Sequence, residues 1–180
     1  MSTGRPRASS REAIADAACE LFLEQGYDET SIADIARRAG VSRSSFFNYF
    51  GSKSDVLWAG LDARIDDLES ALTEEASARA ALASLASGFT PDSLALAIVN
   101  AQQMGLEAEL ERDNALRRAR IGRIVGARLR REGRGRVQSE ILGAAYAAAV
   151  LAAVEAWAHG GAARTSLADA VGRALAYVPD

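Results

Sequence analysis

One helix-start signal, S-x-x-[DE], recurs along the chain and constrains its fold more than any other feature. In this capping box the serine hydroxyl accepts a hydrogen bond from the backbone N–H three residues later, and the acidic side chain accepts one from the backbone N–H of the serine. The signal occurs at Ser9/Glu12, Ser31/Asp34, Ser52/Asp55 and Ser166/Asp169, and Thr90 followed by Pro91 predicts a further start. No segment alternates apolar and polar residues over the length of a strand. The sequence therefore predicts an all-α protein of about nine helices.

The predicted helices differ in length in a way that suggests two domains. They lie near residues 10–25, 31–39, 42–48, from 52 onward, 79–88, 91–104, 108–131, 138–158 and 166–177. The two short helices between 31 and 48 stand apart from the longer ones that follow. We therefore expect an N-terminal domain, residues 1–51, joined by the helix that begins at Ser52 to a larger helical domain, residues 52–180.

The rarity of cysteine and histidine argues against several kinds of site. Cys19 is the only cysteine and His159 the only histidine, which excludes an internal disulfide and disfavours a Cys/His zinc site. No serine or cysteine has a histidine partner at a recognisable spacing, and no phosphate-binding glycine loop occurs. The sequence therefore predicts neither an enzyme nor a cofactor. The basic N-terminal stretch is followed by no apolar run, so we expect no signal peptide and a cytoplasmic protein.

Two short helices joined by a tight turn are typical of a helix-turn-helix, whose second helix lies in the major groove of DNA. This geometry requires a small residue where the helices touch, a glycine at the turn and an apolar anchor on the second helix. Ala36, Gly40 and Phe46 supply them, and Phe50 falls on the same inner face as Phe46. The alternative is a purely structural corner of two helices whose polar face contacts only water.

The predicted outer face of residues 42–49 carries polar side chains: Arg43, Ser44, Ser45, Asn48 and Tyr49. Arginine can donate two hydrogen bonds to guanine and asparagine can pair with adenine, while hydroxyl groups suit phosphates. Because the net charge of the chain is -3, DNA binding would depend on such local groups.

Other basic and helix-start residues extend this predicted surface. A basic arm precedes the first helix and consists of Arg5, Arg7 and Arg11. Such arms often reach into a minor groove or along phosphates. The helix starts at Thr30/Ser31 and Ser52/Lys53 could offer backbone N–H groups to phosphate oxygens.

Residues 10–57, which contain "AACELFLEQGYDETSIADIARRAGVSRSSFFNYFGSKSDVL", resemble the N-terminal DNA-binding domain of the TetR family of bacterial transcriptional regulators. The resemblance rests on the run A-x-x-LF-x-x-x-GY-x-x-TSIADIA-x-x-AGVS, an aromatic-rich third helix, and SK at the start of the fourth helix. It implies a homodimer whose third helices enter successive major grooves. It also implies DNA contacts at Arg43, Ser45, Asn48 and Tyr49, and phosphate contacts at Thr30, Ser31 and Lys53.

Phe47 departs from the pattern of this family, whose members commonly have tyrosine there. A hydroxyl suited to phosphate is therefore absent. Either Tyr49 makes that contact alone, or Phe47 contacts sugar and thymine methyl groups. The version "FF-x-YF-x-SK" is similar to the branch that includes mycofactocin-associated regulators.

The last two predicted helices suggest a dimer interface. Small or apolar residues recur there at four-residue spacing: Ala144, Ala148, Ala152 and Ala156, then Leu167, Val171 and Leu175. An alanine ridge lets another helix approach closely, and a two-fold reader of DNA needs a dimer. The alternative is that both helices pack only within one subunit. Because alanine dominates residues 141–158 and Glu155 lies among them, we expect a buried helix there and not a membrane span.

Ten arginines lie between residues 112 and 136. A solvated helix face is the simplest interpretation. The alternative is that Arg117, Arg118, Arg120 or Arg123 faces an anionic effector. Candidate pocket residues, each of which could instead be ordinary core, are Trp58, Leu61, Val99, Met104, Ile121, Val125, Tyr146 and Trp157.

These features together predict a ligand-responsive transcriptional regulator, most often a repressor in the family that it resembles. It would bind a near-palindromic DNA operator as a homodimer, with half-sites about one helical turn, roughly 34 Å, or a multiple apart. The predicted effector is a small molecule, apolar with an anionic group. The alternatives are a helical interaction module without sequence-specific DNA binding and a small helical enzyme.

Overall fold

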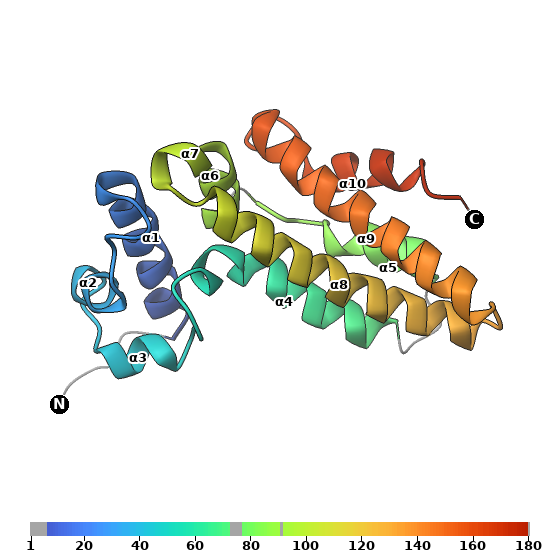
Figure 1. Ribbon diagram of the computed structural model, residues 1–180, viewed down its shortest axis with the longest axis horizontal. Helices are drawn as coiled ribbons and strands as arrows, with labels where there is room; N and C mark the ends of the chain where they lie inside the picture. Colours follow the sequence, from blue (N-terminus) through green and yellow to red (C-terminus); the bar gives the residue numbers. More distant parts are fainter. Residues whose placement is uncertain (1–6, 73–76, 91, 180) are drawn as a thin grey trace. The chain divides into compact units, whose positions relative to one another are not determined.

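The computed structural model describes residues 7–72, 77–90 and 92–179, and in these ranges it contains ten α-helices and no strand (Figure 1). They are α1 (Arg7–Gln25), α2 (Ile32–Arg38), α3 (Arg43–Phe47), α4 (Asp55–Ala71), α5 (Ala78–Leu85), α6 (Ser93–Val99), α7 (Ala101–Met104), α8 (Glu107–Arg131), α9 (Arg136–His159) and α10 (Leu167–Leu175). The all-α prediction is confirmed. The single helix predicted near 91–104 is two helices, because the chain leaves helical geometry at Asn100.

Contacts divide the chain into two compact units. One contains Met1–Ala59 and Asp92–Leu110, and the other contains Gly60–Pro91 and Glu111–Asp180. Helices α4 and α8 therefore contribute one end to each unit. We call the first the reading unit and the second the body. The domain boundary expected between residues 51 and 52 stays a prediction.

Helix α1 forms the centre of the reading unit. Its residues Ile14, Ala18 and Phe22 are fully buried and recur at helical spacing. Helices α2, α6 and α7 pack against it. The backbone N–H of Tyr27, just after α1, donates to the carbonyl of Met104 at the end of α7 (2.7 Å). A segment about 80 residues later in the chain thus completes the unit that carries the helix-turn-helix.

The body is built from α5, α9 and α10 with the adjoining parts of α4 and α8 (Figure 1). Helix α10 packs against α9 and α5. The guanidinium of Arg79 on α5 donates to the carbonyls of Leu175 (2.5 Å) and Val178 (2.9 Å), which lie at the end of α10. This contact satisfies carbonyl groups that a helix end leaves without a partner inside the helix.

Helices α8 and α9 approach each other closely at glycines. A Cβ atom built on Gly143 of α9 would lie 2.5 Å from the carbonyl oxygen of Gly122 and 3.1 Å from the backbone nitrogen of Gly126, both on α8. One built on Gly126 would lie 3.1 Å from the carbonyl oxygen of the buried Ser139. The two backbones therefore meet without side chains between them.

Three of the predicted capping serines accept the expected hydrogen bond. The pairs are Ser31 with the Asp34 N–H (3.1 Å), Ser52 with the Asp55 N–H (3.2 Å) and Ser166 with the Asp169 N–H (3.0 Å). At Ser31 the acid also accepts from the serine N–H, so the full capping box forms. Ser52 and Asp55 make the same pair of bonds, but α4 begins at Asp55, later than predicted.

Two predicted helix starts are wrong. Ser9 does not start its helix, because α1 already begins at Arg7. Thr90 does not cap α6, because the carboxylate of Asp92 does so by accepting from two backbone N–H groups. Aspartate is a strong cap acceptor, and it lies directly before the first helical residue. Pro91 lies outside the described residues.

Helix α9 is the one described helix whose length and composition would allow it to cross a membrane. Just over half of its most apolar window is buried inside the protein. Burial of this kind is expected for a core helix that is apolar all round.

Candidate functional site

The turn between α2 and α3 sets the geometry of the helix-turn-helix. Gly40 has a φ of +69°, a left-handed conformation that glycine adopts without steric cost. The N–H of Val41 donates to the carbonyl of Ala36 (2.9 Å) and closes the turn. Ser42 then caps α3 by accepting from the N–H of Ser45 (3.0 Å). The local sequence therefore accounts for where α2 ends and α3 begins.

Phe46 and Phe50 anchor α3 to the reading unit, as predicted. Both side chains are buried, and their ring centroids lie 5.6 Å apart. Ile35 and Ala36 of α2 are also buried. Burying a phenylalanine side chain contributes about 1.5–3 kcal/mol, which is enough to fix the orientation of a five-residue helix.

The outer face of α3 differs in part from the prediction. Arg43, Ser44, Phe47 and Asn48 are exposed. Ser45 and Tyr49, which were expected to face DNA, are half-buried. The Ser45 hydroxyl lies 2.8 Å from that of Ser42, and the Tyr49 ring centroid lies 6.4 Å from that of Phe50. Ser45 lies inside α3, whereas Tyr49 follows its last residue, Phe47. DNA contacts by all six residues stay predictions.

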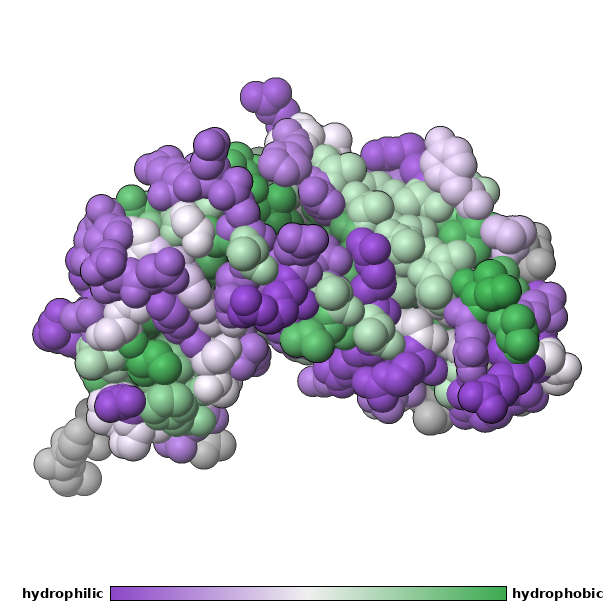
Figure 2. Space-filling model, viewed as in Figure 1, coloured by the Kyte–Doolittle hydropathy of each residue, from purple (hydrophilic) through white to green (hydrophobic). Residues whose placement is uncertain are grey.

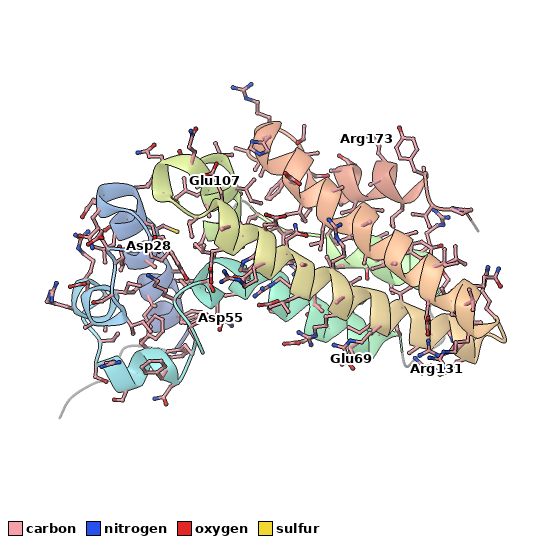
Figure 3. All side chains as sticks on the ribbon, in the orientation of Figure 1. Asp28, Asp55, Glu69, Glu107, Arg131 and Arg173 are labelled. Carbon is pink, nitrogen blue, oxygen red and sulfur yellow. The ribbon has the colours of Figure 1, made fainter. Side chains whose placement is uncertain are left out.

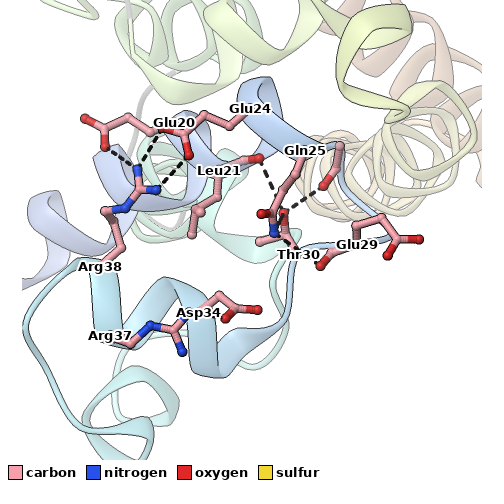
Figure 4. A network of polar contacts seen from close by, with 10 residues as sticks. Glu20, Leu21, Glu24, Gln25, Glu29, Thr30, Asp34, Arg37 and Arg38 are labelled. Atoms are coloured by element: carbon pink, nitrogen blue, oxygen red, sulfur yellow. Dashed lines mark hydrogen bonds and ion pairs between the residues drawn. The ribbon is translucent and has the colours of Figure 1, made fainter.

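Thr30, where a phosphate contact is expected, is buried, and that contact stays a prediction. Its hydroxyl donates to the carbonyl of Gly26 (2.7 Å) and accepts from the side-chain amide of Gln25 (3.3 Å) (Figure 4). Its backbone N–H donates to the carbonyl of Tyr27 (3.2 Å). Thr30 therefore fixes the link between α1 and α2.

Lys53 and Ser31 also make contacts inside the reading unit. The Lys53 ammonium donates to the carbonyls of Tyr27 (2.5 Å) and Thr30 (3.1 Å) and lies 3.9 Å from the Tyr27 ring centroid. Ser31 is exposed, but its hydroxyl donates to Asp34 (2.5 Å), and this bond lowers the pKa of Asp34. The phosphate contacts expected of Lys53 and Ser31 stay predictions.

An ion pair that sequence patterns did not indicate joins α1 to α2. The Arg38 guanidinium contacts Glu20 (3.1 Å) and makes a two-pronged pair with Glu24 (3.0 and 2.7 Å) (Figure 4). The hydrogen bond from Arg38 lowers the pKa of Glu24. The partners lie 14 and 18 residues apart, so no local spacing signals the contact. Arg38 thus positions α2 on α1.

The predicted basic arm is only partly described. Arg5 lies outside the described residues, and Arg7 begins α1 but its side chain is not described. Arg11 donates to the carbonyl of Ala59 (3.4 Å), and its guanidinium lies 5.6 Å from the Phe50 ring centroid. Arg11 therefore packs on the reading unit near the end of α3.

The residues proposed for a dimer interface separate into two groups. Ala144, Ala152 and Ala156 are exposed and Ala148 is half-buried, all on α9. In contrast, the α10 residues Leu167, Val171 and Leu175 are buried inside the subunit, so their assignment to the interface is wrong. They share a spacing with the alanines, but spacing alone does not say whether an apolar helix face meets its own chain or a partner.

The residues proposed for an effector pocket are divided between the two units. Leu61, Ile121, Val125 and Tyr146 are buried in the body, whereas Trp58 and Met104 are buried in the reading unit. Val99 was expected to lie among them, but its side chain is 53% exposed because it ends the short helix α6. Its place in an effector pocket stays a prediction. No group of His, Cys, Asp and Glu among the described residues could hold a metal ion.

Trp157, the remaining pocket candidate, is buried in the body. Its indole N–H donates to the carbonyl of Thr165 (2.9 Å), and its ring meets that of Phe89 edge-on at 5.8 Å. These contacts are those of an ordinary core residue.

The arginine-rich helix α8 is not simply a solvated face. Arg117 is buried and makes a two-pronged pair with Asp62 of α4 (2.9 and 2.6 Å). Arg120 pairs with Asp66, one turn further along α4 (2.5 Å). Near the end of α8, Arg131 donates to the carbonyl of Leu72 (2.9 Å); Figure 3 labels Arg131.

This arrangement corrects both interpretations of the sequence for Arg117, which is neither solvated nor facing an open site. Its carboxylate partner lies 55 residues away in the chain, so the helix pattern of α8 could not reveal it. Arg118 and Arg123 are exposed.

Comparisons with known proteins agree with the geometry of the reading unit. Residues 14–59 match the family model described as bacterial regulatory proteins, tetR family. The chain is 36% identical over 86 residues to the mycofactocin biosynthesis transcriptional regulator MftR of Mycobacterium tuberculosis, covering 44% of this chain and 43% of the relative. It is 46% identical over 59 residues to the HTH-type transcriptional regulator HbdR of Aromatoleum, covering 33% of this chain and 26% of the relative. The chain thus spans less than half of the length of either relative.

Solved structures extend the likeness beyond the reading unit. The TetR-family repressor FadR of Thermus thermophilus, in complex with lauroyl-CoA, is 27% identical, with a TM-score of 0.55 and coverage of 93% of this chain and 92% of that chain. FadR of Bacillus halodurans, at 20% identity, has a TM-score of 0.57 over 92% of this chain and 96% of that chain, which shows a shared fold. All of these relatives are named as regulators and none as an enzyme. Residues 14–59 therefore match the N-terminal domain of the TetR family of bacterial regulatory proteins.

Proposed function

We propose that the chain is a ligand-responsive transcriptional repressor that binds a near-palindromic DNA operator as a homodimer in the cytoplasm. The observation that carries this proposal is the exposed group Arg43, Ser44 and Asn48 on a helix anchored by two buried phenylalanines. Arginine and asparagine can each make paired hydrogen bonds to a base edge, and a helix of this kind fits the major groove.

Dimerisation is supported by an exposed apolar face on α9. Val137 and Ile141 are 69% and 63% exposed, and the alanine ridge continues this face toward the end of the helix. Figure 2 shows pale green, moderately apolar surface over α9. A contiguous apolar face on a helix is costly to leave in water and marks an interaction surface. A two-fold arrangement of subunits would pair this face with its own copy.

The effector that we propose is apolar and carries an anionic group. Its apolar part would lie among buried body residues such as Leu61, Ile121 and Val125. The lauroyl-CoA bound to the FadR of Thermus thermophilus has this chemistry and supports the choice. Arg118 and Arg123 are exposed cations of α8, whereas Arg117 is already paired with Asp62. A ligand would act by binding one of two states of the repressor better than the other.

The proposal is tested by selecting bound duplexes from a genomic DNA pool with the full chain. We expect a two-fold motif, and Arg43→Ala or Asn48→Ala should relax specificity at one base position by about 1–3 kcal/mol. Arg136→Ala removes the same charge as Arg43→Ala from an exposed site in the body and should leave the motif unchanged. Binding that is weak and equally salt-dependent for all sequences would refute sequence-specific recognition and favour an interaction module.

The dimer has its own test. Ala152→Glu places a charge on the exposed face of α9, and Ala83→Glu places one on an exposed position of α5. Analytical ultracentrifugation should show a dimer for the unmodified chain and for Ala83→Glu, and a weakened dimer for Ala152→Glu. An unchanged dimer in Ala152→Glu would show that α9 does not form the interface.

A further inference from the structure

Phe47 stands out on the helix-turn-helix because its apolar side chain is 47% exposed on the same face as Arg43, Ser44 and Asn48. An isolated exposed apolar residue needs no explanation on an ordinary surface. Here it lies between side chains that can bond to base edges. The sequence leaves the role of Phe47 open between two alternatives.

Two neighbours fix the orientation of the Phe47 ring. The edge-to-face contact with Phe46 has a centroid distance of 5.6 Å and an interplanar angle of 83°. The guanidinium carbon of Arg43, one helical turn earlier, lies 5.7 Å from the centroid of the Phe47 ring. Stacking of this kind restrains both partners. The arginine fork and the phenyl ring therefore form one restrained unit on the exposed face of α3.

We infer that Phe47 is a specificity-determining residue that recognises the C5-methyl group of a thymine in the major groove, beside the base bound by Arg43. The inference rests on the proposed function. A phenyl ring has no hydrogen-bonding group, so a phosphate contact would only desolvate the phosphate. The C5-methyl group of thymine is the apolar feature of the major groove, and phenylalanine is one of the side chains that contact it. Phe47 would also restrain Arg43 for its own base contact.

Deoxyuridine tests this contact directly, because it lacks only the methyl group of thymidine and keeps the same base-pairing groups. In an operator recovered by selection, each thymine is replaced in turn and the affinity of the full chain is measured. One position per half-site should lose about fourfold in affinity, from about 0.8 kcal/mol per buried methyl-sized group and 1.36 kcal/mol per tenfold. Replacing both symmetric positions should cost about 15-fold.

Protein variants assign the effect to Phe47. In Phe47→Ala the sensitive position should lose its response to deoxyuridine, whereas Phe47→Tyr keeps the ring and should keep the response. Asn48→Ala lies on the same face and should bind more weakly overall but retain the fourfold response. Circular dichroism melting of each variant verifies folding, which is expected because Phe47 is half exposed.

Each outcome decides between support and refutation. A deoxyuridine response that disappears in Phe47→Ala and persists in Asn48→Ala supports the inference. A two-fold operator with no methyl-sensitive position, or with sensitivity unchanged in Phe47→Ala, overturns it and leaves the proposed function standing. The absence of any two-fold operator overturns the proposed function itself, and the thymine contact with it.

Discussion

Replacing Gly143 with alanine adds one methyl group at the point where α9 meets α8. That methyl carbon would lie 2.5 Å from the carbonyl oxygen of Gly122, whereas real Cβ atoms essentially never approach another heavy atom within 3.0 Å. The obstacle is backbone, which cannot rotate away as a flexible side chain would. The two helices would have to separate, and we expect the body to lose stability.

The magnitude follows from two opposing effects. Overpacking a tight contact typically costs about 1–3 kcal/mol, and a gap of about 0.5–1 Å forfeits a quarter to a half of the dispersion attraction across it. Alanine in place of glycine inside a helix returns about 1 kcal/mol. Because the contact is shorter than any ordinary one and lies against backbone on both Gly122 and Gly126, we expect the cost to lie at the upper end of that range and the net loss to be about 2 kcal/mol.

Two other glycines provide matched controls for the same chemical change. A Cβ atom on Gly172 of α10 would meet nothing within 4 Å. Gly172→Ala should therefore stabilise the chain by up to about 1 kcal/mol. A Cβ atom on Gly122 would have its nearest contact at 3.5 Å, an ordinary van der Waals distance, so Gly122→Ala should also stabilise the chain by up to about 1 kcal/mol.

Urea unfolding at one fixed protein concentration measures all three variants, followed by tryptophan fluorescence and circular dichroism. The concentration must be fixed because the proposed dimer would make unfolding depend on it. The expected order of stability is Gly172→Ala and Gly122→Ala, then the unmodified chain, then Gly143→Ala. A Gly143→Ala variant as stable as the unmodified chain would refute the close backbone contact between α8 and α9.

Further substitutions test contacts inside the two units. In urea titrations, Arg117→Met should lower the free energy of unfolding by about 2–3 kcal/mol. This is somewhat less than for a fully buried ion pair, because Asp62 is partly exposed. A double variant that also carries Asp62→Asn should recover part of the loss. Burial raises the pKa of Asp92 from 3.8 to about 6. Between these pH values the folded chain holds a proton that the unfolded chain releases, so the free energy of unfolding falls as the pH rises from about 4 to 6. Asp92→Asn keeps a cap acceptor. Its urea midpoint should vary less across that window than the midpoint of the unmodified chain, and at pH 7 it should be the higher of the two. Lys53→Met should lower the melting temperature as well as the affinity for DNA, because the Lys53 ammonium donates to two backbone carbonyls. A lower affinity with an unchanged melting temperature would instead indicate that Lys53 only contacts phosphate.

Short-range chemistry explains what could be predicted. A capping box joins residues three apart, so the starts of α2 and α10 at Ser31 and Ser166 were legible in the chain. Phe46 and Phe50 are one turn apart and were correctly assigned to the inner face for the same reason. The outer face was less predictable, because helical spacing does not show that the Ser45 hydroxyl contacts Ser42 or that the Tyr49 ring lies beside that of Phe50.

The sequence by itself therefore determined the helical class, the helix-turn-helix and its phenylalanine anchor, because these depend on contacts within about one turn of helix. The tertiary structure alone decided which apolar faces are buried, including that of Leu167 and Leu175 on α10. It also decided that residues 92–110 complete the reading unit and that Arg117 is paired with a carboxylate 55 residues away. Such contacts depend on which helices lie side by side, and no pattern within a single helix specifies its neighbour.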